Sequence, residues 1–231
     1  MMHSRTPLVA VTLLSAALLS ACQTASVQPE SQPAAAPKAA PATTAPVASS
    51  AALSSCDYRG APMLKNPELK FDYQRGRPAG WLINQHGGDK TYEVDSRDGV
   101  LRINNYGKQY WMRLSQRFPA HDLVGREFVF SADIKMDLNP EGWVRTLVPG
   151  GGLTVVVRGQ KPGTHNTKSV LYTTSMPNEP RHGQLDWHRR EHRFTIPEGA
   201  RFLELGFLHQ AHGEMWIQDP QFIPTECIKS I

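Results

Sequence analysis

The sequence predicts an all-β fold in which two antiparallel sheets pack face to face as a sandwich. Apolar and polar residues alternate with a period of two along several segments. In 126–136, for example, Phe128, Phe130 and Ile134 fall on one face and Asp133 on the other. Turns containing Gly and Pro separate these segments, and signals for helices are scarce. Many short strands joined by polar turns are typical of a β-sandwich.

The first 22 residues resemble the export signal of a bacterial lipoprotein. An apolar stretch, 8–21, follows His3 and Arg5. It is shorter than the ~20 apolar residues of a membrane-spanning helix and suits the core of a signal peptide. The letters LSAC that end at Cys22 resemble a lipobox, which implies a signal peptide over 1–21 and acylation of the cysteine, palmitate included. An ordinary secretory signal with a chance cysteine is the alternative.

Residues 22–55 are predicted to form a disordered tether. The segment is rich in Ala, Pro, Ser and Thr and has almost no large apolar side chain. Such a composition cannot bury enough surface to offset the entropy lost on ordering, and its prolines favour extended conformers. The residue after Cys22 is Gln23 and not Asp. By resemblance to Gram-negative lipoproteins, this favours a cell-envelope location at the outer membrane.

The folded domain is expected to cover residues 56–231, and a cysteine lies near each of its ends. With Cys22 acylated, Cys56 and Cys227 remain out of three cysteines in the chain. The bacterial periplasm and cell surface are oxidising, so we predict a disulfide that joins the first and last segments of the domain. Two free thiols are the alternative.

Nine segments of the domain are predicted to form strands. Their apolar residues either alternate with polar ones or form a short run bounded by glycines, as in 152–159. The predicted strands are 90–95, 100–105, 109–118, 126–136, 152–159, 169–175, 188–197, 201–209 and 214–222. His188 and His192 are spaced as zinc ligands would be on a helix, but on a strand they stand ~13 Å apart, which argues against a metal pair.

The order of these segments resembles the jelly-roll carbohydrate-binding modules of families 4, 9 and 22, in the galactose-binding-like superfamily. The similarity is carried by NPELKFDYQRGRPAGW (66–81), by Gln116 ahead of LVGREFVFSADIKM (123–136), by WHRREHRFTIPEGARFLELGF (187–207) and by GEMWIQDPQF (213–222). It covers roughly 66–222 and implies a jelly-roll sandwich. Because one fold hosts many functions, it says less about the ligand.

The resemblance implies non-covalent binding of a glycan or glycoconjugate. Sugar rings stack on aromatic side chains, and their hydroxyls need planar polar partners. The candidate ligand-binding residues are Trp111, Arg113, Asp133, Trp143, Tyr172 and Glu204. Taken singly, each aromatic residue among them is also explained as a cover for the sheet surface. Trp81, Trp187 and Trp216 match core or turn positions of the family pattern and are expected to be structural.

The same resemblance suggests a structural calcium ion. The matching ligands would be Asp72 and Asp219, while a further family aspartate is replaced here by Gln218. Calcium takes six or more oxygen ligands, so the replacement weakens this expectation.

Other classes of function find less support. The formal net charge is +4, from 25 basic and 21 acidic residues, and the basic residues form no concentrated stripe, so a nucleic-acid partner is not expected. This mild basicity favours an acidic ligand such as a polyanionic glycan or a lipid headgroup. No sequence motif with a catalytic mechanism is apparent, which favours a binding protein over an enzyme. A protein-interaction or assembly lipoprotein and a polysaccharide-active enzyme remain as alternatives.

Overall fold

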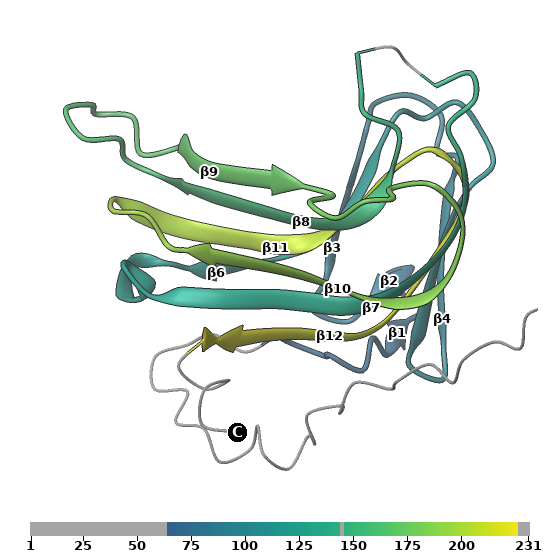
Figure 1. Cartoon of the computed structure of the whole chain (residues 1–231), viewed down its shortest axis with the longest axis horizontal. Helices are drawn as coiled ribbons and strands as arrows, with labels where there is room; N and C mark the ends of the chain where they lie inside the picture. The colour runs from purple at the N-terminus through teal and green to yellow at the C-terminus, as the bar shows by residue number, and fades with distance from the viewer. Residues whose placement is uncertain (1–63, 144–145, 226–231) are drawn as a thin grey trace, which may run out of the picture. The chain divides into compact units, whose positions relative to one another are not determined.

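Ten strands form two five-stranded antiparallel sheets in the computed structural model, which describes residues 64–143 and 146–225 (Figure 1). The predictions for the signal peptide, the tether, Cys22, Cys56 and Cys227 lie outside the described residues. No helix in the described ranges is long and apolar enough to cross a membrane.

Each sheet mixes strands that are distant in sequence. The first, here the β11 sheet, has the order β3 (Leu82–Gln85), β6 (Met112–Pro119), β11 (Ala200–Gln210), β8 (Gly150–Gly159) and β9 (Ser169–Ser175). The second, here the β7 sheet, has the order β10 (Gly183–Thr195), β7 (Glu127–Asn139), β12 (His212–Pro224), β5 (Val100–Asn105) and β4 (Tyr92–Arg97). Smaller elements are β1 (Phe71–Asp72), β2 (Arg77–Pro78) and the 3-10 helix η1 (His121–Leu123).

The prediction of a two-sheet antiparallel sandwich is confirmed. All nine predicted segments form strands, β4 to β12. The sequence reading missed β1, β2 and β3, and it started β10 five residues too late, at 188 instead of Gly183. β3 was missed because it has only four residues and lies at a sheet edge, where little of its surface needs to be apolar.

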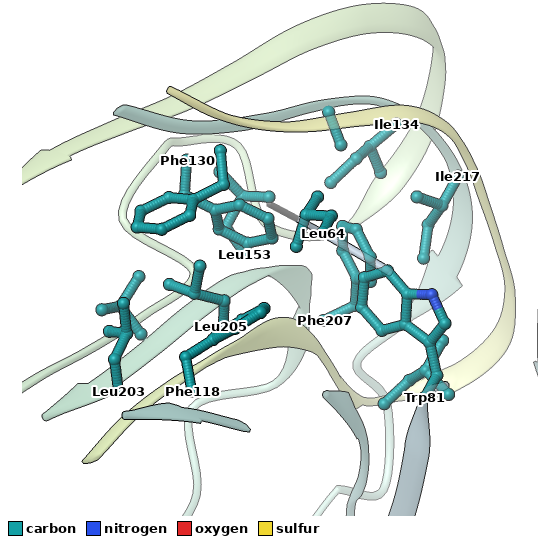
Figure 2. Packing of buried hydrophobic residues seen from close by; sticks show 14 of the residues in the cluster. Leu64, Trp81, Phe118, Phe130, Ile134, Leu153, Leu203, Leu205, Phe207 and Ile217 are labelled. Carbon is teal, nitrogen blue, oxygen red and sulfur yellow. The ribbon is translucent and has the colours of Figure 1, made fainter. Parts of the chain in front are cut away.

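Side chains from the inner faces of both sheets fill the core. Phe130 and Ile134 of β7 and Leu205 and Phe207 of β11 are fully buried, as their alternation predicts. The ring of Trp81 stacks on Phe207 with centroids 5.6 Å apart, and Figure 2 shows the two side by side. Burying each such side chain contributes roughly 1.5–3 kcal/mol.

Because side chains alternate along a strand, the inward residues that fill the core also determine which residues lie on the outer face of the β11 sheet. Along β11, Leu203, Leu205 and Phe207 point inward, so Phe202 and Glu204 point outward. Because β6 and β8 flank β11 and follow the same alternation, outward side chains from all three strands meet on one surface. This surface carries the groove described next.

Candidate functional site

A groove of about 350 Å³ lies on the outer face of the β11 sheet. It has four basic side chains, one carboxylate and two apolar side chains. The lining residues are Arg113, Arg117, Val156, Arg158, Lys168, Phe202 and Glu204.

Strand register places the lining residues around β11. Glu204 lies opposite Arg117 of β6 on one side and opposite Val156 of β8 on the other. Two residues before Glu204 on the same face of β11, Phe202 lies opposite Arg158. Directly opposed residues in an antiparallel pair have Cβ atoms ~5 Å apart, so these side chains contact one another across the strands. The sheet itself therefore fixes the groove.

Glu204 organises the basic residues on the β6 side. The residue is 5% exposed, and burying its charge without a partner would be costly. The carboxylate accepts a hydrogen bond from the Ser115 hydroxyl at 3.1 Å and lies 2.9 Å from Arg113 Nη2 and 3.5 Å from Arg117 Nη2. These contacts hold both guanidinium groups beside the groove. Arg113 keeps a buried Nε that has no acceptor in the described parts of the chain.

Phe202 supplies an exposed aromatic surface near the start of β11. It is 47% exposed, whereas most residues of this strand are buried. It also borders a second hollow of about 580 Å³, which includes His121, Gln160 and Arg201. Phe202 lines both hollows, so they lie next to each other on either side of this side chain.

Of the six predicted ligand-binding residues, the structure brings two together. Arg113 and Glu204 form the ion pair in the groove. Trp111 is half-buried, its ring lies 6.4 Å from that of His86, and it does not line the groove. It sits just before β6, two positions from Arg113.

The other three predicted residues lie elsewhere, so the structure does not bring all six together at one place. Asp133 is on the β7 sheet, where it pairs with Arg189 at 3.3 Å. Trp143 lies in the loop after β7, its ring 5.0 Å from that of His212. Alternation within a strand does not reveal which sheet the strand joins, and this is why Asp133 was grouped with Arg113.

Tyr172 points into the sandwich and not onto its surface. Its ring stacks on the rings of His192 and Phe194, at 6.1 and 6.0 Å, and its hydroxyl lies 2.5 Å from His192 Nε2. Burial raises the pKa of Tyr172 and lowers the pKa of His192. The pairing of β9 with β8 shifts by one residue at Leu171, so Tyr172 lies opposite the core residue Val157.

The three tryptophans expected to be structural differ in position. Trp81 is fully buried, as expected. Trp187 is 38% exposed at a register shift in β10, and Trp216 is half-buried beneath the Lys135 ammonium group, 5.7 Å from its ring centroid. Trp187 and Trp216 therefore lie at the surface of the β7 sheet.

The carboxylates of the two expected calcium ligands contact other groups of the protein. The Asp72 carboxylate accepts hydrogen bonds from the backbone N–H groups of Gln74 and Arg75, which cap a turn. The Asp219 carboxylate lies 2.9 Å from Arg189 Nη1 and also accepts a hydrogen bond from Gln221. No group of three or more His, Cys, Asp or Glu side chains suited to a metal occurs within 64–143 and 146–225.

Five groove residues were absent from the predicted set, namely Arg117, Val156, Arg158, Lys168 and Phe202. The alternation of 201–209 does place Phe202 on the same face as Glu204, and that of 109–118 places Arg117 with Arg113. Arg158 and Lys168 can be assigned to the groove only once the pairing of β8 with β11 is known.

Comparison with known proteins gives distant structural likenesses. No protein-family model and no curated protein matches the sequence. A CBM4 structure is 15% identical, with a TM-score of 0.39 over 62% of this chain and 86% of its own. The C-terminal family 22 carbohydrate-binding module of Clostridium thermocellum Xyn10B is 11% identical, with a TM-score of 0.37 over 69% and 95% of the two chains. TmCBM61, solved with β-1,4-galactotriose, is 15% identical, with a TM-score of 0.36 over 70% and 97%.

Proposed function

We propose that this protein binds a glycan or glycoconjugate non-covalently in the groove of the β11 sheet. The observation that carries the proposal is the exposed ring of Phe202 beside the Arg113–Glu204 pair. A sugar ring can place its apolar C–H face on the phenyl ring. Its hydroxyl and acidic oxygens then accept hydrogen bonds from guanidinium groups that Glu204 already orients, which lowers the entropy lost on binding.

The composition of the groove favours binding over hydrolysis. Glycosidases that cleave by the common mechanisms use two carboxyl groups about 5–9.5 Å apart. Glu204 is the one carboxylate lining the groove in the described residues, and both of its oxygens face arginines. A carboxylate held in this way supports orientation of its partners and is poorly suited to transfer a proton.

The proposal includes a location at the cell envelope. The support is the N-terminal sequence, in which an apolar stretch ends at Cys22 and a Pro- and Ala-rich segment follows. Lipid at Cys22 would hold the protein at the outer membrane, and the tether would let the sandwich reach glycans at a distance from it.

The test is to screen the protein, purified in mild detergent from cells expressing the full chain, against an array of bacterial and plant glycans, and to repeat it with Phe202→Ala. We expect the substitution to weaken binding by roughly tenfold or more, because the stacking surface is lost. The fold should be kept, since Phe202 lies outside the core.

Tyr73→Ala is the matched control, because Tyr73 is 78% exposed and distant in sequence from the groove strands. It removes an exposed aromatic ring and should leave binding unchanged. Retention of the wild-type affinity by a folded Phe202→Ala variant, or absence of binding to every glycan, would overturn the proposal.

A further inference from the structure

We infer that the glycan bound in this groove is acidic, that is, a polysaccharide bearing carboxylate or sulfate groups. This inference rests on the proposed function and names the ligand class of the same site. It follows from how charge is distributed around Phe202.

The groove carries more positive charge than its one carboxylate neutralises. Four basic side chains face one carboxylate, which leaves an excess of three positive charges. Glu204 is shared between Arg113 and Arg117. Arg158 and Lys168 form no ion pair with any residue in the described ranges. A neutral sugar would leave this excess uncompensated, whereas an acidic one would offset it.

The positive charges flank the aromatic ring on both sides. Arg113 and Arg117 come from β6, and Arg158 and Lys168 come from β8 and the loop that follows it. A sugar stacked on Phe202 thus has cations within reach of substituents on either edge of its ring. Guanidinium groups bind carboxylate and sulfate oxygens through paired hydrogen bonds, which are stronger than hydrogen bonds between neutral groups.

The shape of the site favours a polymer over a small anionic headgroup. Phe202 also lines the neighbouring hollow of about 580 Å³, where Gln160 and Arg201 add a polar and a basic side chain. A lipid headgroup would engage one position, whereas consecutive sugars of a chain can occupy both hollows. We therefore assign the site to an acidic polysaccharide.

The experiment compares pairs of polysaccharides that share a backbone and differ in charge, again with the detergent-purified full chain. The pairs are polygalacturonate and its methyl ester, heparin and its desulfated, N-acetylated and carboxyl-reduced derivative, and alginate and carboxyl-reduced alginate. We expect at least one acidic member to bind, with at least tenfold weaker binding of its neutral partner. Binding of the acidic member should also weaken as the salt concentration rises.

The variant that tests the residues is Arg158→Gln/Lys168→Gln, which removes two positive charges without touching the Glu204 contacts. It should lower affinity for the acidic polysaccharide by roughly tenfold or more, because two charge-assisted contacts are lost. The control, Arg75→Gln/Arg97→Gln, removes the same charge from exposed positions outside the groove and should change affinity by less than about twofold.

Three other outcomes would overturn the inference, and they differ in whether the proposed function also fails. Equal binding of acidic and neutral partners would overturn the inference and keep the proposed function. No binding to any glycan would overturn both. If vesicles with anionic phospholipid bind through Arg158 and Lys168 while no polysaccharide does, the ligand is a lipid surface, and both fail.

Discussion

Glu204 shows how one residue can hold two arginines in place on the face of a sheet. Arg113 and Arg117 stand four residues apart on β6, and Ser115 lies between them on the same face of the strand. The nearly buried carboxylate of Glu204 contacts both guanidinium groups and limits the conformations of both side chains. The sequence predicted that Arg113 and Glu204 are functional, but it could not show that β6 and β11 are neighbours. The ion pair exists because of that adjacency.

His209 is a buried residue whose titration links stability to pH. It is fully buried, and its Nε2 lies 3.2 Å from the Gly213 carbonyl oxygen. Its ring also packs at 83° to that of Tyr92, whose hydroxyl donates to the His209 carbonyl at 2.9 Å. Burial lowers the pKa of His209 to about 3, and nearby His212 acts in the same direction. The folded protein therefore keeps this imidazole neutral at moderately acidic pH.

We predict that stability falls as pH drops below about 6.5. The unfolded chain binds a proton at His209 near its ordinary pKa of about 6.5, whereas the folded protein does so only near 3, so acid favours unfolding in this interval. Between pH 7 and pH 5 the loss from this one residue should be about 2 kcal/mol. Urea unfolding at a series of pH values measures it.

Two variants separate this effect from other acid-sensitive groups. His209→Gln should show a flatter pH dependence between pH 7 and pH 5, whatever its stability at pH 7. His165→Gln, at an exposed loop position, should keep the wild-type slope. A His209→Gln slope equal to that of the wild type would contradict the prediction.

At the scale of elements, β11 is the central strand of its sheet and pairs tightly with β6. Gly206 makes this pairing close, because a Cβ atom there would lie 2.0 Å from the Leu114 carbonyl oxygen and 2.7 Å from Ser115 Cα. Real atoms do not approach so closely, and the obstacle is backbone, which cannot rotate away. Gly206 is thus required by the neighbouring strand.

We predict that Gly206→Ala destabilises the protein by about 3 kcal/mol, the upper range for overpacking, because β6 must move away from β11. Gly87→Ala is the matched control, since nothing lies within 4 Å of its added Cβ, and it should change stability by less than about 1 kcal/mol. Urea unfolding of both variants provides the measurement. A Gly206→Ala variant as stable as Gly87→Ala would show that the strands tolerate the methyl group.

The strands themselves could be predicted because each buries one face. Alternation in β7 and β6 marked the buried Phe128 and Leu114 correctly, since a period of two follows directly from strand geometry. The partners of each strand could not be predicted from period alone. Asp133 and Arg113 occupy equivalent outward positions in the pattern, yet their strands belong to opposite sheets. The pairing of β8 with β11, which brings Arg158 to Phe202, is likewise a long-range contact.

At the scale of the whole molecule, positive charge is concentrated and not uniform. The formal net charge of the full chain is +4, while the groove alone has an excess of three. The remainder is therefore close to neutral. A nearly neutral body with one basic groove directs an acidic ligand to that groove and limits non-specific attraction elsewhere.

The proposed lipid anchor makes a prediction about the whole protein in cells. Cys22→Ser should abolish incorporation of radiolabelled palmitate and move the protein from the membrane fraction to the soluble fraction, because acyl chains provide the membrane affinity. Cys56→Ser is the control and should keep both the label and the membrane association. Glycan binding by the purified Cys22→Ser variant should equal that of the wild type, since the groove is built from β6, β8 and β11. Label on the Cys22→Ser protein, or an unlabelled wild type, would contradict the anchor and leave the groove's proposed ligand unaffected.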